Sequence, residues 1–435
     1  MQIQAAILLV ISFFVMLFFS VPVSYSIIIS AFLTITAFLT PQFGTFVAAQ
    51  NVITGIDSFS LIAVPFFILA GLLMSSGGIA KRLINLAMLF LGRVPGALTL
   101  TNAAGNAMFG SISGSGIAAA TAIGGVLLPL EKEEGYDDGY AAAVNIATAP
   151  VGQLIPPTTA FIVYSAAAGG TSVATLFMAG WIPGLLWTAC CMVVALAYAA
   201  RHGYVRKNRD KITLSIVLKT VWEAIPSLLL IVIIIGGILS GKFSPTEASG
   251  VAVVYALILS VVFYRSIKLS DLPKILLDTA NMTTIVMLII GASSVLSFVM
   301  SFTELPAAIS ALVLGVSSNK FVLLLILNVL LLVIGTFMDM APALLIFTPI
   351  FLPIAQSLGM SDVQFGVMMV MNLSVGTITP PVGNVLFVGC SIAKLQVEDV
   401  MKRLMPLFAA IVVALLMVTY IPALSEWLPT VLGLM

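Results

Sequence analysis

Apolar stretches of about twenty residues, the length that crosses a bilayer as one helix, recur along the whole chain between shorter polar segments. No charged side chain interrupts residues 1–56. The pattern therefore predicts an all-α integral membrane protein. The predicted spans are 3–19, 22–40, 58–76, 138–168 and 181–200 in the first half, and 213–240, 246–264, 279–302, 362–392 and 404–431 in the second.

Two further apolar segments, 97–130 and 321–356, are too long for one ordinary span and carry Gly at their centres. We predict that each is a re-entrant helical hairpin, which enters the membrane and returns to the same side. A non-helical tip at membrane depth is tolerated only where protein or a water-filled cavity covers it. The two predicted tips are 111–116 and 335–340.

The same skeleton occurs twice, in residues 101–157 and 325–381. Proline removes a backbone donor and obstructs the preceding helical turn, so breaks are predicted at 149–157 and 374–381. A duplicated pair of broken helices is typical of the binding site of a secondary transporter. The matched positions, each pair 224 apart (376 − 152, for example), are Pro129 with Pro353, Gly135 with Gly359, Gly152 with Gly376, and Pro156-Pro157 with Pro380-Pro381.

Loop charges indicate how the spans are oriented. The strongly basic stretch is 201–211, and the excess of Lys and Arg in cytoplasmic loops places it inside. Counting from there gives five crossings in each half and places both termini outside, on the periplasmic side. A repeat that follows an odd number of crossings enters from the opposite side, so the second half is predicted to be inverted.

Composition excludes several classes of protein. The chain is 61% hydrophobic and only 8% charged, whereas soluble domains carry about a quarter charged residues. A net charge of +1 gives no reason to expect nucleic acid. The three cysteines lie in apolar runs, without metal-ligand spacing or a disulfide framework. No carboxylate pair, nucleophile–base arrangement or phosphate-binding loop is apparent, so neither an enzyme nor an ATPase is predicted.

Each predicted tip and the break that faces it supply hydroxyl and carbonyl oxygens, which are the ligands of hard cations such as Na⁺. The candidate Na⁺ ligands are Ser113, Ser115, Asn145, Thr148 and Gly152 in the first set, and Gly335, Asp339, Thr377, Thr379 and Pro380 in the second. Helix N-termini directed at the midplane would favour an anionic substrate. The candidate substrate contacts are Ser111, Gly114, Gly116, Pro156, Pro157, Gly376 and Pro381.

Asp339 is the strongest single candidate for a functional residue, because placing a carboxylate within an apolar membrane segment costs free energy. An ion ligand, a proton carrier and a hydrogen-bond acceptor that organises the tip all remain open for it. Other acidic residues have simpler interpretations. Glu131, with its acidic neighbours, is predicted to lie in a solvated inside loop, and Glu247 to cap a first helical turn.

Several long motifs in this order resemble the large membrane subunit of tripartite ATP-independent periplasmic (TRAP) transporters, and the resemblance covers nearly the whole chain. The motifs are NAMFGSISGSGIAAATAIGGVLLP (106–129), NIATAPVGQLIPPTTAFIVYS (145–165), GKFSPTEASGVAVVYALILSVVFYR (241–265), GTFMDMAPALLIFTPIFLPI (335–354) and NLSVGTITPPVGNVLFV (372–388).

The resemblance implies an elevator-type transporter of the bacterial inner membrane, in which a transport domain slides against a scaffold. It implies Na⁺-coupled uptake of an organic acid, sialic acid or another carboxylate, with Na⁺ as the coupling ion. It also implies two partners, a separate small membrane subunit and a periplasmic substrate-binding protein. The chain most resembles the sialic acid branch.

On this basis the chain divides into scaffold, arm and transport parts. The transport units, each a hairpin with a broken helix, are 95–170 and 320–392. Scaffold helices and arms precede them in 1–94 and 213–319. An arm, a span and the basic connector occupy 171–212, and an arm with the last span occupies 393–435.

A stand-alone ion-coupled dicarboxylate carrier, which needs no binding protein, is the alternative. Transport by the lone chain would favour that alternative. A channel would need a continuous polar pore, yet charged residues within the spans are nearly absent.

Overall fold

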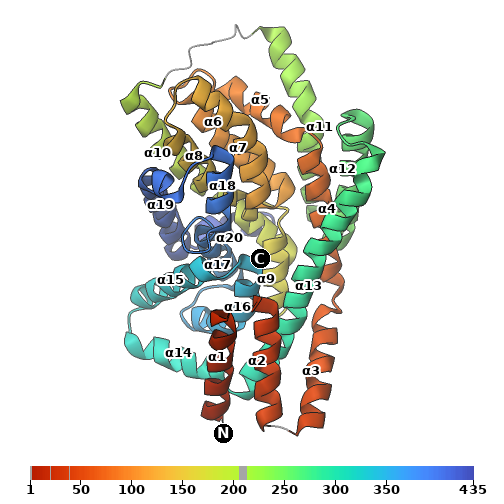
Figure 1. The fold of residues 1–435 in the computed structure, drawn as a ribbon, viewed down its shortest axis with the longest axis vertical. Coiled ribbons are helices and arrows are strands. Elements are labelled where there is room, and N and C mark those ends of the chain that lie inside the picture. Colours follow the sequence, from red (N-terminus) through yellow and green to blue (C-terminus); the bar gives the residue numbers. More distant parts are fainter. Residues whose placement is uncertain (1, 20, 39, 205–212) are drawn as a thin grey trace.

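The computed structural model describes residues 2–19, 21–38, 40–204 and 213–435, and these residues form helices and turns without a strand (Figure 1). The predicted all-α class is confirmed. Four of the basic residues used to orient the chain, Arg206, Lys207, Arg209 and Lys211, lie outside the described residues.

The described residues of each half of the chain form ten α-helices. Those of the first half are α1 (Gln2–Phe18), α2 (Val23–Phe38), α3 (Pro41–Ile56), α4 (Ala63–Ser76), α5 (Ile79–Leu91), α6 (Ala97–Ser113), α7 (Gly116–Glu133), α8 (Asp138–Thr148), α9 (Thr159–Ala167) and α10 (Val173–His202). Those of the second half are α11 (Leu214–Leu239), α12 (Pro245–Leu257), α13 (Leu272–Phe302), α14 (Leu305–Val316), α15 (Lys320–Phe337), α16 (Met340–Ser357), α17 (Asp362–Gly376), α18 (Asn384–Ala393), α19 (Val397–Tyr420) and α20 (Ala423–Val431). Short 3₁₀ or π segments are η1 (Phe59–Ile62), η2 (Ala149–Gln153), η3 (Ile258–Phe263) and η4 (Leu269–Asp271).

Within the described residues, eight helices are long and apolar enough to cross a membrane. Shorter apolar helices, among them Val23–Phe38 and Leu305–Val316, accompany them. Many large apolar side chains on α1, α11 and α13 face outward, as is expected of helices whose surroundings are lipid or another membrane subunit. The chain is therefore a multi-pass membrane protein.

The helices differ from the predicted spans in two places. Residues 41–56 were not predicted as a helix, yet they form α3, whose first residue Pro41 has the fixed φ that suits a helix start. Their Gln, Asn, Gly and Thr residues dilute the apolar pattern. The span predicted at 404–431 is interrupted, because α19 ends at Tyr420 and α20 begins after Pro422, whose missing N–H cannot continue a helix.

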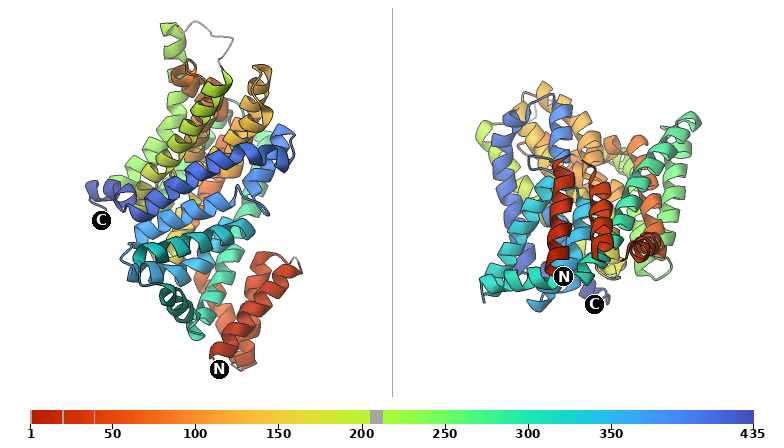
Figure 2. Two further views of the ribbon diagram at one scale, coloured as in Figure 1. Left: turned by 90° about the vertical axis from the view of Figure 1, so that its left-hand side faces the viewer. Right: turned by 60° about the horizontal axis from the view of Figure 1, so that its bottom comes forward.

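The helices of the two halves interlock instead of forming separate bundles. α7 of the first half packs against α18 of the second, and α16 of the second packs against α9 of the first. Two further pairs also join the halves, because α4 packs against α12 and α2 packs against α13. Figure 2 shows α1 to α3 gathered at one end of the molecule, away from α7 and α18. The hairpins and breaks thus lie at the contact between the halves.

The predicted cap at Glu247 is confirmed. Its carboxylate accepts a hydrogen bond from the backbone N–H of Ser244 at 2.8 Å, and the Ser244 hydroxyl accepts one from the backbone N–H of Glu247 at 3.2 Å. This reciprocal pair satisfies two N–H groups at the start of α12.

Candidate functional site

The first predicted hairpin consists of α6 and α7, which pack against each other and are joined by a very short turn. Gly114 ends α6 with a φ of +63°, a left-handed conformation that glycine adopts without a steric penalty. Ser115 then begins α7, and its hydroxyl accepts a hydrogen bond from the backbone N–H of Ala118 at 3.3 Å. The turn falls where the sequence predicts a tip.

The first predicted break is confirmed. α8 ends at Thr148, the chain continues as the short segment η2, and α9 begins only at Thr159. The hydroxyl of Thr158 caps α9 by accepting a hydrogen bond from the backbone N–H of Ala160 at 3.2 Å. The Pro156–Pro157 peptide bond is cis, as is Pro380–Pro381 in the second half.

The second predicted hairpin consists of α15 and α16, joined at Met338 and Asp339. Asp339 is exposed, and its carboxylate accepts a hydrogen bond from Asn384 Nδ2 at 3.0 Å. Asn384 is the first residue of α18, beyond the second break. This contact ties the tip to the break, as expected of a hydrogen-bond acceptor that organises the tip.

The second predicted break is also confirmed, because α17 ends at Gly376 and α18 begins at Asn384. The backbone N–H of Val382 in the break donates to the carbonyl of Thr336 on the hairpin at 3.2 Å. The Thr377 carbonyl accepts the backbone N–H of Val385 at 3.0 Å. The unwound backbone is therefore held by defined hydrogen bonds on both sides.

Paired glycines bring each hairpin into direct backbone contact with its break. A Cβ atom added to Gly152 would lie 2.5 Å from Gly110 Cα, and one added to Gly110 would lie 2.4 Å from Gly152 Cα. In the second half, a Cβ atom on Gly376 would lie 2.3 Å from the carbonyl carbon and oxygen of Gly335. Real Cβ atoms do not approach so closely, so only glycine fits at positions 110, 152 and 376.

A buried amide network joins the first hairpin to α8. Asn106 Nδ2 of α6 lies 3.1 Å from Asn145 Oδ1 and 2.9 Å from Thr148 Oγ1, and also 3.0 Å from Asn102 Oδ1. Asn145 donates to the carbonyl of Ala120 on α7 at 3.1 Å. Asn145 and Thr148 therefore stand in a network that links α6, α7 and α8, whereas Ser113 and Ser115 stand at the tip.

The second half has a corresponding link. Asn372 Nδ2 of α17 donates to the side-chain oxygen of Asn328 on α15 at 3.0 Å, and Asn328 Nδ2 donates to the hydroxyl of Thr419 on α19 at 3.1 Å. Buried amide pairs of this kind hold a hairpin arm and a broken helix in one orientation.

Three of the predicted hydroxyl ligands, Thr148, Thr377 and Thr379, donate to helical carbonyls of Val144, Ser374 and Gly376 at 2.7, 2.7 and 2.9 Å respectively. Such a bond uses the hydroxyl hydrogen and leaves the oxygen able to accept, and the Thr148 oxygen already accepts from Asn106 Nδ2 at 2.9 Å. Ser111, a candidate substrate contact, donates to the carbonyl of Met108 at 2.7 Å.

The remaining predicted residues fall on the same surfaces. Gly114 and Gly116 contact the first break, since added Cβ atoms would lie 3.1 Å from the Pro157 carbonyl and 3.2 Å from Pro150 Cα respectively. Pro156 is buried, and Pro380 and Pro381 are exposed.

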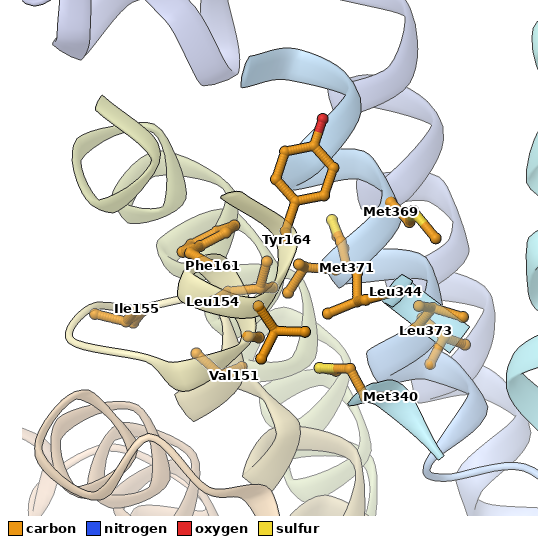
Figure 3. Packing of buried hydrophobic residues seen from close by; sticks show 14 of the residues in the cluster. Val151, Leu154, Ile155, Phe161, Tyr164, Met340, Leu344, Met369, Met371 and Leu373 are labelled. Atoms are coloured by element: carbon orange, nitrogen blue, oxygen red, sulfur yellow. The ribbon is translucent and has the colours of Figure 1, made fainter. Parts of the chain in front are cut away.

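Apolar residues next to the two sets of candidate residues pack against each other across the contact between the halves. In Figure 3, Val151, Leu154 and Phe161 of the first break and α9 face Met340 and Leu344 of the second hairpin. An added Cβ atom on Gly116 would also lie 3.3 Å from a methyl group of Val385 on α18. Each tip is thus packed against the break of its own half and lies beside the other half.

Sequence reasoning missed Gly110, Asn106, Asn328 and Asn384, which contact the predicted residues. A signal existed for one of them, because Asn102 and Asn106 are four residues apart in an apolar helix and so share one face.

The prediction that Glu131 lies in a solvated loop is wrong. Its side chain is 0% exposed. Glu131 lies four residues after Leu127 and seven after Gly124, so it continues the buried face of α7. Glu133, two residues later, falls on the exposed face.

The donor chemistry at the two tips fits a hard monovalent cation. The oxygen atoms near them belong to hydroxyl groups, backbone carbonyls and the Asp339 carboxylate. Within the described part of the chain there is no group of three His, Cys, Asp or Glu residues that could hold a metal ion. Neutral oxygens with one carboxylate suit Na⁺ better than a transition metal.

Comparison with known proteins gives consistent matches. A family model described as "Tripartite ATP-independent periplasmic transporter, DctM component" matches residues 10–424. The protein YgiK of Salmonella typhimurium is 50% identical over 390 residues, which are 90% of this chain and 89% of that protein.

Two relatives bear the names of transporters. The isethionate TRAP transporter permease protein DctMQ of Oleidesulfovibrio alaskensis is 39% identical over 376 residues, and the match covers 86% of this chain but 59% of that longer protein. The sialic acid TRAP transporter large permease protein SiaM of Vibrio cholerae is 36% identical over 390 residues, or 90% of this chain and 91% of that protein.

Among solved structures, the YdaH transporter of Alcanivorax borkumensis superimposes with a TM-score of 0.61 at 15% sequence identity, and the match covers 87% of each chain. At that identity the likeness concerns the fold alone.

Proposed function

Because the chain belongs to the DctM family, the large membrane subunits of tripartite ATP-independent periplasmic transporters, we propose that it carries out Na⁺-coupled uptake of an organic acid across the bacterial inner membrane. In this proposal the two hairpins and two broken helices form a transport domain, which moves as an elevator against the remaining helices. A small membrane subunit and a periplasmic substrate-binding protein complete the system.

The observation that carries the proposal is the pair of glycine contacts between hairpin and break. Gly110 meets Gly152 in the first half, and Gly335 meets Gly376 in the second. Each contact brings a hairpin helix against a broken helix at the point of its interruption, within η2 in the first half and at the last residue of α17 in the second. Discontinuous helices form the site of a secondary transporter in this way.

An inverted repeat is supported by the correspondence between elements. α16 begins and ends 224 positions after α7 (340 − 116 and 357 − 133), and α17 begins 224 positions after α8 (362 − 138). In both halves, the second helix of the hairpin packs against the helix that follows the other half's break: α7 against α18, and α16 against α9. Two such equivalent contacts are expected of a repeat with two-fold symmetry. In this arrangement the hairpins enter the membrane from opposite sides.

The site is proposed to hold Na⁺ and an anion together. Ser113, Ser115 and Gly152 with the Asn145–Thr148 segment would hold one cation, and Gly335, Asp339, Thr377, Thr379 and Pro380 would hold the other. Bound Na⁺ would supply positive charge that strengthens the binding of an anionic substrate. The N-termini of α7, α9, α16 and α18 all lie at a tip or a break, where their dipoles add to that charge.

The substrate class is proposed to be an acid with one carboxylate and neighbouring hydroxyl groups, of which sialic acid is one example. The relatives' names span isethionate and sialic acid. Both are anions, and the proposed site offers cations, helix N-termini and hydroxyl groups to such a ligand.

Uptake into liposomes tests the function directly. The chain would be reconstituted with its small subunit, and the binding protein would be loaded with each member of a panel of labelled acids. We expect accumulation that requires both partners and an inward Na⁺ gradient, without ATP. Accumulation by the chain alone would favour the stand-alone carrier, and uptake that ignores the Na⁺ gradient would refute the proposed coupling.

Asp339→Asn tests the second cation site. The variant removes a negative charge while it keeps an oxygen at the tip, so we expect the Na⁺ concentration for half-maximal uptake to rise about tenfold, equivalent to about 1.4 kcal/mol of binding free energy. Na⁺ titration of the initial uptake rate measures this. Asp57→Asn, at an exposed acid outside both hairpins, serves as the matched control. Equal half-maximal concentrations in Asp339→Asn and wild type would exclude Asp339 from the cation site.

A further inference from the structure

Among the acidic residues that the structure describes, Glu131 is the most completely buried. It is 0% exposed, and in the described residues neither carboxylate oxygen has a hydrogen bond of normal geometry or a cationic partner. Burying an ionised carboxylate without a partner costs several kcal/mol. Such a group therefore takes up a proton, or it reaches water or a cation in another conformation of the protein.

The position of Glu131 lies outside the apolar part of the first hairpin. It is followed by Lys132, Glu133 and Glu134, and Lys132 pairs with Asp138 across the turn at 2.8 Å. This end of α7 is therefore in the aqueous, charged region, where a proton can reach water after a small displacement. Burial raises the pKa of the Glu131 carboxyl to about 8, and only the nearby amide of Asn102 opposes the shift.

The elements packed against α7 bring no cation to the carboxylate. α6 and η2 hold no titratable side chain, and α18 holds only Cys390. The cations of α5, Lys81 and Arg82, line a separate pocket, where the Arg82 guanidinium lies 3.5 Å from the Tyr264 ring centre.

The titratable groups that do face this region are phenols and already paired charges. Tyr140 of α8 is close enough to Glu131 for their charges to interact, and its hydroxyl is held by the carbonyl of Ala195 at 2.7 Å. Tyr136, between α7 and α8, stacks on Tyr204. The Asp137 carboxylate forms an ion pair with the Arg403 guanidinium, with 2.8 Å between Oδ2 and Nη2.

Glu131 is also connected to the moving parts of the proposed mechanism. Asn102, its amide neighbour, accepts a hydrogen bond from Asn106, and Asn106 holds Asn145 on the broken helix. A change in the charge of Glu131 would act first on the nearby amide of Asn102, and through Asn102 on the contacts between α6 and α8.

We propose that Glu131 is a proton-binding site, protonated in the conformation described here and deprotonated when this end of the hairpin opens to water. In the release step the O–H bond of the carboxylic acid breaks, the proton passes to water, and the carboxylate remains. Each return to the buried conformation then takes up one proton. The inference rests on the proposed transport function for its kinetic readout but not for its stability readout.

Glu131→Gln is the decisive variant because glutamine has nearly the same shape and is always neutral. In wild type, the fraction of protonated Glu131 falls about tenfold between pH 7 and pH 9 for a pKa near 8, so Na⁺-driven uptake is expected to fall by a similar factor. In Glu131→Gln this fall should disappear. Glu133→Gln, on the exposed face of the same helix end, should keep the wild-type profile.

Thermal unfolding of the purified protein gives a second readout that needs no transport. Because the folded-state pKa is raised above the ordinary 4.5, protonation of Glu131 stabilises the fold, and this stabilisation is lost as pH rises from about 4.5 to about 8. The Tm advantage of Glu131→Gln over wild type should therefore grow across that range and stay constant above it.

The outcomes separate the two hypotheses. If wild type shows no Na⁺-driven uptake at any pH with both partners present, the proposed function fails, and the unfolding series still tests Glu131. If wild type transports but Glu131→Gln keeps the same pH profile, or if the Tm difference is independent of pH, the proton site is refuted.

Discussion

Replacing Gly152 with leucine should reduce uptake by about 100-fold or more while the protein still inserts in the membrane, because displacements near 1 Å at an active site have effects of this size. A Cβ atom at this position would lie 2.5 Å from Gly110 Cα, and the obstacle is backbone that cannot rotate away. The larger side chain would separate α6 from the first break and displace the proposed ligands at the tip. Initial uptake rates at saturating Na⁺ measure the loss.

Gly236→Ala is the control, because an added Cβ atom at Gly236 on α11 has no neighbour within 4 Å. Its uptake should match wild type. Gel filtration of both variants in detergent distinguishes a blocked site from a misfolded chain. Normal uptake by Gly152→Leu would show that the contact between hairpin and break is not needed for transport.

Gly376→Leu should produce the same loss in the second half. An added Cβ atom would lie 2.3 Å from the carbonyl carbon and oxygen of Gly335, so even Gly376→Ala should impair uptake severely. The variant also moves the end of α17, which is followed directly by Thr377 and Thr379 in the break. The apparent Na⁺ affinity should therefore fall wherever residual uptake can be measured.

The matched substitution is Gly335→Ala, on the other side of the contact. Its added Cβ atom would lie 3.3 Å from Gly376 Cα, which is tight but not overlapping. A graded series is therefore expected, in which Gly335→Ala loses less uptake than Gly376→Ala and Gly376→Leu loses most. If Gly376→Leu transports as well as Gly335→Ala, the second break does not act as proposed.

The hairpins and breaks were predictable because glycine and proline act locally. Gly114 turns the chain with a positive φ, and the Pro-Pro pairs interrupt helices whatever their surroundings. The repeat spacing of these residues then located both pairs of elements. The residues that contact them were not predictable, because the approach of Gly110 to Gly152 joins positions 42 apart (152 − 110) through tertiary packing.

Helix ends were the other source of error. Glu131 stands in a charged sequence, and only the rotation of α7 determines that it continues the face of Leu127 and not that of Glu133. A hydropathy pattern does not resolve that rotation over the last turn of a helix. α3 escaped prediction for a different reason, because its polar residues dilute the apolar pattern.

The opposite orientation of the two halves is central to the proposed mechanism, and the accessibility of two introduced cysteines tests it directly. Glu133 and Ser357 are the last residues of α7 and α16, are both exposed, and occupy corresponding positions (357 − 133 = 224). Glu133→Cys and Ser357→Cys would each be made after replacement of Cys190, Cys191 and Cys390, and probed in intact cells and inside-out vesicles with a membrane-impermeant thiol reagent. We expect labelling of Glu133→Cys only from the cytoplasmic side and of Ser357→Cys only from the periplasmic side. Labelling of both cysteines from one side would contradict the inverted arrangement.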